Sequence, residues 1–461
     1  MKNNLIKNNA IKKITILLML PMALVNFAQA ETGENLYQYN CAQCHGKNRE
    51  GAVGPSLVDN IWLHGEPTKA NLINIITKGI PDKAMPGWAS TLSAENIALI
   101  SDYLLTKSNV DKSTVNQMPE LSNLKLPNGF TISVYADKVE NARSMAVADN
   151  GIVYVGSRVA GKVYAVVDEN KDKVADKVIT VAENLNAPIG VTLLNGSLYV
   201  AEISRVIKFD NIAKTYNTKP KYKIIKDDFP TDKWHGQKII KAGPDGKIYI
   251  PIGAPCNVCD REDEVYSKIW RMNPDGSDFE IYASGVRNTV GFAWHPTTKE
   301  MWFTDNGRDE MGDNIPSCEL NHAPKAGMHF GFPYCHSGVV PDPEFGKLKS
   351  CDQFVPPAAH LGPHVAPLGL HFYTGKQFPA QYQQNIFVAE HGSWNRTRKI
   401  GYRVNLITLG NSKVVSDTPF IEGFLQDEKV IGRPVDIAQM DDGSMLISDD
   451  LGGRLYRVSY K

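Results

Sequence analysis

The sequence has no excess of charge of either sign: 50 Lys and Arg residues balance 50 Asp and Glu residues in 461. Nucleic-acid backbones and anionic membrane surfaces attract proteins with a basic surplus, so neither is an expected partner. Long apolar runs are missing beyond residue 30, which predicts no membrane span in the mature chain. Apolar residues still make up 42% of the chain, enough for two separate folded cores.

Residues 1–30 have the order of a secretory signal peptide. A basic start at residues 2–13 is followed by an apolar run at 14–25 and by the small-residue cleavage site Ala28-Gln29-Ala30. The mature protein is therefore expected to begin near Glu31 and to be periplasmic or secreted. An apolar run of about a dozen residues is shorter than the roughly 20 that span a bilayer, although an uncleaved anchor is the alternative.

Cysteine is scarce and odd in number: with seven residues, at least one thiol lacks an internal disulfide partner. Two of the seven belong to a haem motif. Disulfides persist in exported proteins, and four of the other five cysteines are close enough in sequence to pair. The suggested pairs are Cys256 with Cys259 and Cys335 with Cys351, which leaves Cys318 free. Sequence alone does not fix this connectivity, so the pairing is a hypothesis.

The sequence pattern changes from helical to β-rich about a quarter of the way along the chain. Residues 31–108 show helical spacing of apolar residues, most clearly in 69–77 and in the run from Ser93 to Leu105. Residues 109–125 are polar, lack periodicity in their first part, and predict a linker. From 126 to 461, short β-rich runs alternate with turn residues. We therefore expect a small all-α domain followed by an all-β domain.

The β-rich part contains six copies of a strand, turn and strand unit. The turns are Asp149-Asn150-Gly151, Asn195-Gly196, Asp245-Gly246, Pro296-Thr297-Thr298, Gln384-Asn385 and Asp442-Gly443. Six such units predict a six-bladed β-propeller. A sandwich or an open β-solenoid is the alternative, because each repeat is weak by itself.

The same alignment predicts a site. A short distance before each turn, the chain would enter the innermost strand of its blade at the mouth of the central channel. The residues there are Arg143, Pro188, His235, Arg287 with Asn288, His364 and Arg433. Three guanidiniums and two imidazoles would meet on one axis, in a pocket suited to a polyanion with a base beside it. A solvated charge at the rim is the alternative for Arg143.

Cys41-Ala42-Gln43-Cys44-His45 is the attachment signature of a c-type haem. In this motif two thiols bond to the porphyrin vinyl groups, and the adjacent histidine binds the iron. A structural disulfide between Cys41 and Cys44 is the alternative, and the histidine that follows them argues against it.

Met85 is the expected sixth ligand of the haem iron. It lies in Ala84-Met85-Pro86-Gly87-Trp88, which resembles the methionine loop of small class I cytochromes c. Gly54-Pro55 also matches that family, in which the proline carbonyl orients the histidine ligand. Methionine and histidine ligation raises the haem potential and favours an electron carrier over an oxygen activator. A buried core methionine is the alternative.

Several segments of residues 126–461 carry a further resemblance. They include Trp234-His235-Gly236, Ser284-Gly285-Val286-Arg287-Asn288, Asp305-Asn306-Gly307-Arg308, His391-Gly392-Ser393-Trp394-Asn395-Arg396 and Gly432-Arg433-Pro434. Together they resemble the glucose/sorbosone dehydrogenase family of quinoproteins, particularly its sorbosone dehydrogenase-like members. The resemblance implies pyrroloquinoline quinone (PQQ) as cofactor.

The resemblance also implies which residues bind the quinone. PQQ carries three carboxylates and an ortho-quinone, for which guanidiniums are suitable partners and an amide a suitable donor. The implied contacts are Arg287, Arg396, Arg433 and Asn288, with Arg143, His364 and His391 lining the pocket. His235 would take the substrate hydroxyl proton, and Arg287 would steady the oxygen that becomes negative. A purely structural role is the alternative for each histidine.

Calcium is expected at one place and considered at a second. In the family a calcium ion bridges the quinone to the protein, partly through backbone carbonyls of the loop that matches Gly307 and Arg308, and oxygen ligands suit that ion. Separately, four oxygen side chains have the spacing of half a calcium loop. These are Asp168, Asn170, Asp172 and Asp176. Lys173 replaces the usual glycine there, so a solvated acidic hairpin is the alternative.

The sequence thus predicts a periplasmic quinohaemoprotein dehydrogenase. It would oxidise a sugar, sugar aldehyde or related alcohol with PQQ and pass electrons through its haem c to a soluble cytochrome, a copper protein or a respiratory oxidase. Fusion of the two domains keeps the haem at high effective concentration. The alternative is a non-catalytic or hydrolytic ligand-binding propeller with a cytochrome c sensor or docking module, because propellers host many unrelated functions.

Overall fold

The computed structural model describes residues 32–46, 49, 51, 54–55, 57–58, 64, 68–80, 85–106, 121–261 and 264–461. The predicted signal peptide and residues 109–120 of the predicted linker lie outside these ranges. The chain divides into two compact units, residues 1–110 and 111–461, and each is described by itself. No helix in the described ranges is long and apolar enough to cross a bilayer.

The first unit is helical, as its apolar periodicity predicted. Its helices are α1 (Gly33–Asn40), α2 (Ala42–His45), α3 (Lys69–Lys78) and α4 (Ala94–Leu105). The three longer helices each begin after a hydroxyl residue whose side chain accepts a backbone N–H of the first turn. Those capping residues are Thr32, Thr68 and Ser93. The apolar faces bury Leu36, Tyr37, Leu72, Ile76, Ile97, Ile100 and Leu104 in one core.

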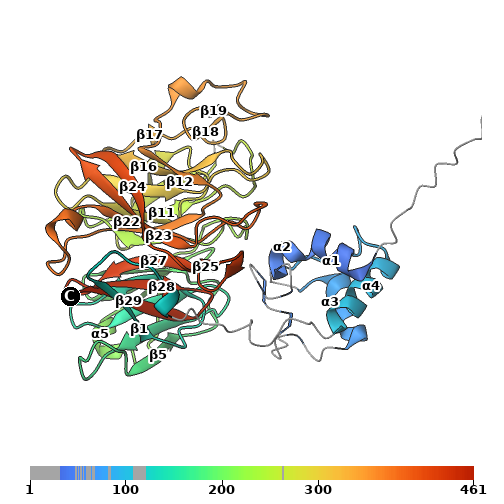
Figure 1. The fold of residues 1–461 in the computed structure, drawn as a ribbon, viewed down its shortest axis with the longest axis horizontal. Helices are drawn as coiled ribbons and strands as arrows, with labels where there is room; N and C mark the ends of the chain where they lie inside the picture. The colour runs from blue at the N-terminus through green and yellow to red at the C-terminus, as the bar shows by residue number, and fades with distance from the viewer. Residues whose placement is uncertain are drawn as a thin grey trace, which may run out of the picture. The chain divides into compact units, whose positions relative to one another are not determined.

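The second unit is a ring of six β-sheets, each with four antiparallel strands in the order of a propeller blade (Figure 1). Blade one is β2 (Ala142–Val147), β3 (Val153–Ser157), β4 (Val163–Val167) and β5 (Lys177–Ala182); blade two is β6 (Gly190–Leu194), β7 (Ser197–Ala201), β8 (Val206–Phe209) and β9 (Lys223–Lys226). Blade three is β10 (Lys241–Ala242), β11 (Ile248–Ile252), β12 (Lys268–Met272) and β13 (Glu280–Ser284), with β17 (Met328–His329) added parallel to β13.

Blade four is β14 (Gly291–Trp294), β15 (Met301–Asp305), β16 (Ser317–Ala323) and β20 (Ala359–Pro363); blade five is β21 (Pro367–Phe372), β22 (Ile386–Glu390), β23 (Arg403–Gly410) and β24 (Lys413–Ile421). Blade six is β27 (Pro434–Gln439), β28 (Met445–Asp449), β29 (Arg454–Tyr460) and β1 (Phe130–Ala136). Smaller elements are β18 (Cys335–His336) with β19 (Val340–Pro341), β25 (Leu425–Gln426) with β26 (Lys429–Val430), helix α5 (Ile212–Thr215), and the 3₁₀ turns η1 (Leu121–Asn123), η2 (Cys351–Gln353) and η3 (Ala380–Tyr382).

Blade six joins the two ends of the propeller. Strand β1 pairs antiparallel with β29, in a register that runs from Phe130 opposite Tyr460 to Ala136 opposite Leu455. In Figure 1 the teal strand β1 lies beside the red C-terminal strands. The first strand of the propeller therefore completes the same sheet as the last three strands. Main-chain hydrogen bonds between β1 and β29 close the ring.

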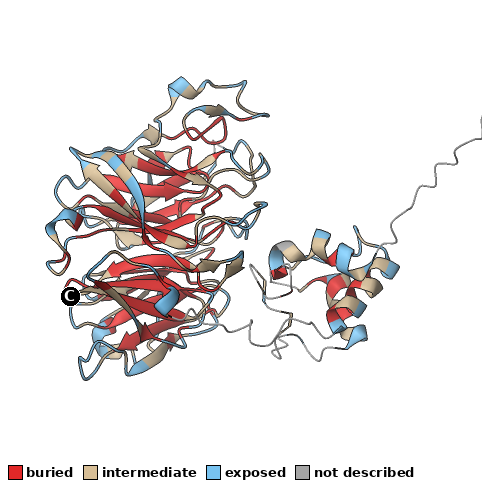
Figure 2. Cartoon of the chain, in the orientation of Figure 1, coloured by how far each residue is buried: buried red, intermediate tan, exposed pale blue. Residues whose placement is uncertain are grey.

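The six turns found in the sequence connect the first and second strands of the six blades, so the predicted six-bladed propeller is confirmed. First strands of neighbouring blades pack together, as β2 does against β6 and β27. The strands are mostly buried and the connecting loops exposed (Figure 2). Clusters of apolar side chains fill the space between blades; Tyr154 and Val163 of blade one, for example, pack with Val191 and Leu198 of blade two.

Candidate haem and quinone sites

The haem motif of the first unit is built around His45, which is 8% exposed. Its Nδ1 lies 2.9 Å from the carbonyl oxygen of Pro55, so Nδ1 carries the proton and Nε2 keeps its lone pair. Gly54 permits this close approach, since a Cβ there would lie 2.8 Å from Cε1 of the imidazole. Burial lowers the pKa of His45, which keeps the ring in the neutral form that binds iron.

The other haem residues fit the same arrangement. Cys41 precedes α2 and Cys44 lies on it, and the two thiols are not joined in a disulfide. Met85 packs against the helical core of this unit. The residues present therefore fit a covalently attached haem with a histidine ligand, whereas ligation of the iron by Met85 stays a prediction.

In the propeller, the predicted channel residues lie where five blades begin their first strands. Arg143 is the second residue of β2, Arg287 and Asn288 precede β14, and Arg433 directly precedes β27. His235 and His364 lie in the segments before β10 and β21. Because first strands occupy equivalent positions in every blade, these residues share one end of the ring. Their hydrogen bonds and ion pairs divide them between two clusters.

The first cluster surrounds the carboxylate of Asp450, which follows β28. Nη1 of Arg143 donates to Oδ2 over 3.0 Å, Nε of Arg433 donates to Oδ1 over 2.9 Å, and Nε2 of His391 lies 3.0 Å from Oδ1. The nearby Arg433 and His391 outweigh burial and hold the pKa of Asp450 well below its usual range. Burial lowers the pKa of His391 to about 4, so this imidazole is neutral and its Nε2–H donates.

The Asp450 cluster has donors left over. Arg143 is only 5% exposed, yet its Nε is buried without an acceptor among the described residues. The two terminal nitrogens of Arg433 also have no acceptor in the described part of the chain. A buried guanidinium N–H without a partner costs free energy, and an anionic ligand would satisfy it.

The second cluster surrounds Arg287, whose side chain already has protein acceptors on every nitrogen. Nε donates to the backbone oxygen of Asn257 over 2.8 Å, and Nη2 donates to Oδ1 of Asn257 and to Oδ2 of Asp309 over 2.8 and 2.9 Å. Nη1 donates to the carbonyl of Gly307 over 2.8 Å. Arg287 is therefore held rigidly, and it can influence a ligand mainly through its charge.

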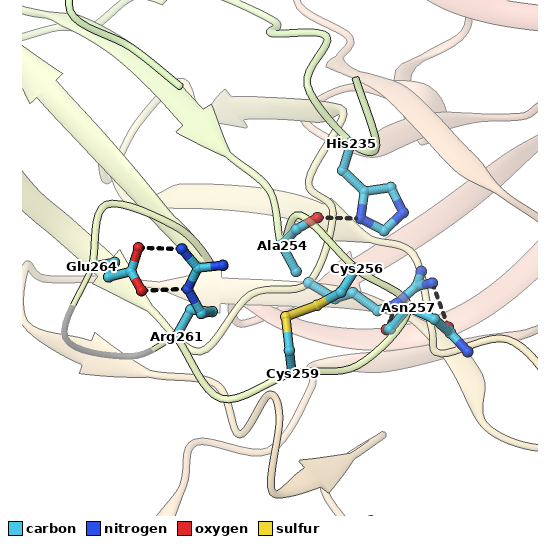
Figure 3. Close-up of a disulfide and its surroundings, with 8 residues drawn as sticks. His235, Ala254, Cys256, Asn257, Cys259, Arg261 and Glu264 are labelled. Carbon is cyan, nitrogen blue, oxygen red and sulfur yellow. Dashed lines mark hydrogen bonds and ion pairs between the residues drawn. A yellow bond between two sulfur atoms is a disulfide. The ribbon is translucent and has the colours of Figure 1, made fainter. Parts of the chain in front are cut away.

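His235 has the geometry of a base. Its Nδ1 lies 2.9 Å from the carbonyl oxygen of Ala254, which fixes the proton on Nδ1, and its Nε2 has no partner among the described residues (Figure 3). Burial and the charge of Arg287 lower the pKa of His235 well below 6.5. The imidazole is therefore neutral near pH 7, with a lone pair available to accept a proton.

Asp309 connects further residues to the second cluster. Its Oδ1 accepts from Nδ2 of Asn395 over 2.8 Å and lies 4.0 Å from Nδ1 of His364. Nε2 of His364 is in turn 2.8 Å from the carbonyl oxygen of Gly312. The sequence assigned no role to Asp309 or Asn257, and it indicated Asp450 only as part of the segment Ser448-Asp449-Asp450 that resembles the quinoprotein family. Buried arginines indicate that acceptor side chains must lie nearby, but the sequence does not show which residues these are.

The side chains of three predicted residues, Asn288, Arg308 and Arg396, make no hydrogen bond to these clusters among the described residues. Arg396 donates from Nε to the carbonyl of Asp313 over 2.8 Å and from Nη2 to Asn314, and within the described part of the chain its side chain makes no hydrogen bond to either cluster. The side chain of Arg308 pairs with Asp342. Asn288 engages through its backbone, donating its N–H to Asp305 over 2.7 Å, while its side chain makes no hydrogen bond to the described residues.

The two clusters contain more guanidiniums than paired carboxylates. Arg143, Arg287 and Arg433 form ion pairs with Asp309 and Asp450, and His235 and His391 are neutral. The buried carboxyl groups of Asp305, Asp436 and Asp449 act on the same guanidiniums. The site is thus less basic than its arginine count suggests, and the N–H donors left over on Arg143 and Arg433, rather than a net charge, are what an anion would satisfy.

Most side-chain oxygens of the Asp168 loop accept hydrogen bonds within the loop, whereas Oδ1 of Asp168 is buried without a partner among the described residues. Oδ2 of Asp176 accepts the backbone N–H of Glu169 over 2.7 Å, and Oδ1 of Asp172 accepts that of Val174 over 2.9 Å. Oδ1 of Asn170 accepts the N–H of Asp172. Among the residues that the structure describes, no group of three or more His, Cys, Asp or Glu side chains is placed to hold a metal ion. Calcium at this loop stays a prediction.

Comparison with known proteins agrees with this architecture. Residues 124–461 match the model of the TrAA12-like family. The chain belongs to the TrAA12-like family. An uncharacterized protein of Borreliella burgdorferi is 34% identical over 358 residues, which cover 74% of this chain and 92% of that protein.

The TrAA12-like propeller also resembles solved structures. The PQQ domain of pyranose dehydrogenase from Coprinopsis cinerea superposes with a TM-score of 0.63 at 17% identity, covering 74% of this chain and 98% of that chain. At this identity the likeness shows the fold.

The N-terminal unit of the TrAA12-like protein is a cytochrome c domain. Residues 28–104 match the model of the cbb3-type cytochrome c oxidase subunit III. Cytochrome c55X of Stutzerimonas stutzeri is 38% identical over 91 residues, which cover 19% of this chain and 79% of that protein.

Proposed function

We propose that this protein is a periplasmic, cytochrome-linked dehydrogenase that oxidises a sugar, sugar aldehyde or related alcohol with PQQ. The observation that carries the proposal is a neutral, half-buried histidine, His235, with a free Nε2 lone pair beside Arg287. The other arginine cluster of the propeller holds an orphaned guanidinium donor on Arg143. The fold shared with a PQQ domain of pyranose dehydrogenase supports the same function.

The first cluster is where the residues fit a quinone carboxylate. Nε of Arg143 and the terminal nitrogens of Arg433 are the donors that lack protein acceptors among the described residues. Asp450 fixes both guanidiniums and leaves N–H donors on each, which the oxygens of an anion would accept. His391, held neutral by burial and oriented by the same carboxylate, would line the pocket without adding a charge.

The second cluster is where a substrate proton would be taken. PQQ, when bound, would supply the two-electron acceptor for hydride leaving the substrate carbon. Nε2 of His235 would accept the hydroxyl proton, which its neutral state allows at pH 7. Arg287 would favour the developing negative charge on the substrate oxygen through its fixed positive charge, without releasing its hydrogen bonds.

Electrons would leave through the N-terminal domain. Haem c attached to Cys41 and Cys44 supplies one-electron transfer, which couples a two-electron oxidation to a one-electron acceptor. His45 is already oriented by Pro55 for iron binding. A soluble cytochrome, a copper protein or a respiratory oxidase would be the acceptor.

A calcium ion at the quinone would lie next to a guanidinium. The carbonyl of Gly307, which the family resemblance implies as a ligand, already accepts Nη1 of Arg287 over 2.8 Å. A carbonyl oxygen has a second lone pair for a cation, but the adjacent guanidinium repels that cation. We therefore derive no catalytic step from calcium; chelation of the loaded enzyme would measure its contribution.

The experiment is a substrate panel read at the haem. The purified protein is loaded with PQQ and calcium and mixed with aldoses, sugar aldehydes and secondary alcohols while the haem absorbance is followed. We expect haem reduction that requires both PQQ and substrate, and that falls by about 10²-fold or more in His235→Ala. His360→Ala, at an exposed histidine of β20, is the matched control and keeps wild-type rates.

A ligand-binding propeller without dehydrogenase activity predicts a different result. The haem would stay oxidised across the whole panel even though PQQ binds. That outcome would disprove the proposed dehydrogenase activity. The N-terminal domain would still be expected to carry electrons.

A further inference from the structure

One short loop contacts both members of the proposed catalytic pair. The loop follows β11 and begins at Ala254, whose carbonyl oxygen lies 2.9 Å from Nδ1 of His235. The backbone N–H of Ala254 donates to the backbone oxygen of Arg287 over 2.8 Å. Three residues later, Asn257 accepts from Nε of Arg287 with its backbone oxygen and from Nη2 with Oδ1, both over 2.8 Å.

Asn257 has a second set of contacts that fixes its own side chain. Its Oδ1 also accepts the backbone N–H of Asp309 over 2.9 Å, and its Nδ2 donates to the carbonyl of Asp309 over 3.1 Å. Asp309 is the residue whose carboxylate accepts Nη2 of Arg287. Asn257 therefore joins the blade-three loop to the guanidinium and to the residue that pairs with it.

A disulfide encloses Asn257. Cys256 and Cys259 are bonded to each other, so Asn257 and Val258 lie inside a ring closed by three peptide steps (Figure 3). Figure 3 shows the disulfide next to Asn257, with Ala254 and His235 on the preceding side of the loop. Such a short cross-link restricts the backbone of the residues that it spans, which keeps the carbonyl of Asn257 directed at Arg287.

We propose that the Cys256–Cys259 loop is a positioning element for His235 and Arg287: Ala254 fixes the Nδ1–H tautomer of His235, and Asn257 fixes the guanidinium of Arg287. The proposal rests on the proposed function of this pair. It assigns a role to a disulfide that core packing does not require, because both cysteines are only half-buried. It also explains why each guanidinium nitrogen of Arg287 donates to an acceptor of the protein rather than being left available for a ligand.

The first test compares two disulfides. The double variant Cys256→Ser/Cys259→Ser removes the positioning ring, whereas Cys335→Ser/Cys351→Ser removes the other disulfide as a matched control. We expect the first to lose about 10²-fold in kcat, the size of effect that follows from misplacing reacting groups by about 1 Å, with a small change in KM. The control keeps kcat, and thermal melts of both variants report any general loss of stability.

The second test substitutes Asn257 itself and does not depend on the disulfide. Asn257→Ala removes the side-chain acceptor of Arg287, while Asn257→Asp keeps an acceptor oxygen for the guanidinium but replaces the donor to the Asp309 carbonyl by a charged carboxylate oxygen. We expect Asn257→Ala to lower kcat about as much as the disulfide variant, and Asn257→Asp to recover a large part of it. A role in stability alone would change the melting temperature without this pattern of recovery.

The third test needs no quinone and no substrate. Selective ¹⁵N-histidine labelling of the cofactor-free protein reports which ring nitrogen of His235 carries the proton, with His235→Gln identifying its signals. Wild type and the Cys335/Cys351 variant should show the Nδ1–H tautomer, and the Cys256/Cys259 variant a mixture with Nε2–H. An unchanged tautomer together with an unchanged kcat overturns the proposal.

These readouts separate two failures. If no substrate is oxidised by wild type, the proposed function fails, but the tautomer comparison still decides whether the loop positions His235. If oxidation is found and both variants retain full kcat, the dehydrogenase stands and the positioning role is wrong.

Discussion

Arg143 and Asp450 lie 307 positions apart in the chain, yet Nη1 of Arg143 donates to Oδ2 of Asp450 over 3.0 Å with both side chains almost fully buried. The pair joins blade one to the end of β28 in blade six, next to the seam where β1 completes the ring. The same carboxylate holds Arg433 and His391. One buried acid thus determines the positions of three residues that were predicted to bind the quinone.

Substitution of Asp450 should be costly both to the fold and to the site. Asp450→Ala leaves the buried guanidinium of Arg143 without its counter-ion, a change that typically lowers the free energy of unfolding by about 3–5 kcal/mol. We expect that loss in a denaturant titration, together with weaker PQQ binding measured by titration of quinone into cofactor-free protein. Glu183→Ala, which removes an exposed partner of Lys219, is the control and should change stability by less than about 1 kcal/mol.

Cys318 should be unreactive in the native protein. It is 2% exposed, and burial raises the pKa of its thiol to about 11, so almost none is thiolate near neutral pH. The other cysteines are in the haem motif or in disulfides. Alkylation of the haem-loaded protein, read by mass spectrometry, should therefore modify no cysteine until denaturant is added and then modify Cys318 alone. Native labelling of any residue in positions 256–259 would contradict the disulfide.

The fold was largely accessible from the sequence because its signals are local. Turn residues such as Asp245-Gly246 and Asp442-Gly443 sit between alternating strands, and each turn is specified by a few neighbouring residues. The caps at Thr68 and Ser93 mark helix starts for the same reason. Repetition then gives the blade count, since six equivalent units have few ways to bury their apolar faces.

The site was accessible only in part. Position in the repeat located Arg143, Arg287 and His235 at one end of the ring, because equivalent strands begin at equivalent places. It did not reveal that the arginines divide between Asp450 and Asp309, since these ion pairs link segments that are distant in sequence. Nor could it show that the guanidinium of Arg287 is saturated by protein acceptors, which depends on the path of the loop around Asn257.

His371 should make the propeller less stable in mild acid. Burial and the charge of Lys241 lower its pKa from 6.5 to about 4. Between those values the unfolded chain binds a proton that the folded chain excludes, so this contribution to stability is intact above pH 6.5 and is lost as the pH falls toward 4. One such group changes the free energy of unfolding by up to ~1.4 kcal/mol per pH unit. His371→Gln should flatten that dependence in denaturant titrations at pH 7 and pH 5, whereas His360→Gln, at an exposed position, should not. Equal slopes for wild type and His371→Gln would show that acid sensitivity arises elsewhere.

Met85 gives a test of the N-terminal domain that is independent of the quinone. If its thioether binds the haem iron, Met85→Ala replaces a methionine ligand by water or a weaker group, and the reduced state loses stabilisation. Axial ligands set haem potentials across about 0.8 V, so we expect a fall on the order of 0.1 V in a redox titration of the full-length protein. Leu92→Ala is the control, because Leu92 packs against the same helical core and a packing loss alone should leave the potential near that of wild type. If Met85→Ala lowers the melting temperature as Leu92→Ala does and leaves the potential unchanged, Met85 is a core residue and the iron takes its sixth ligand from another side chain.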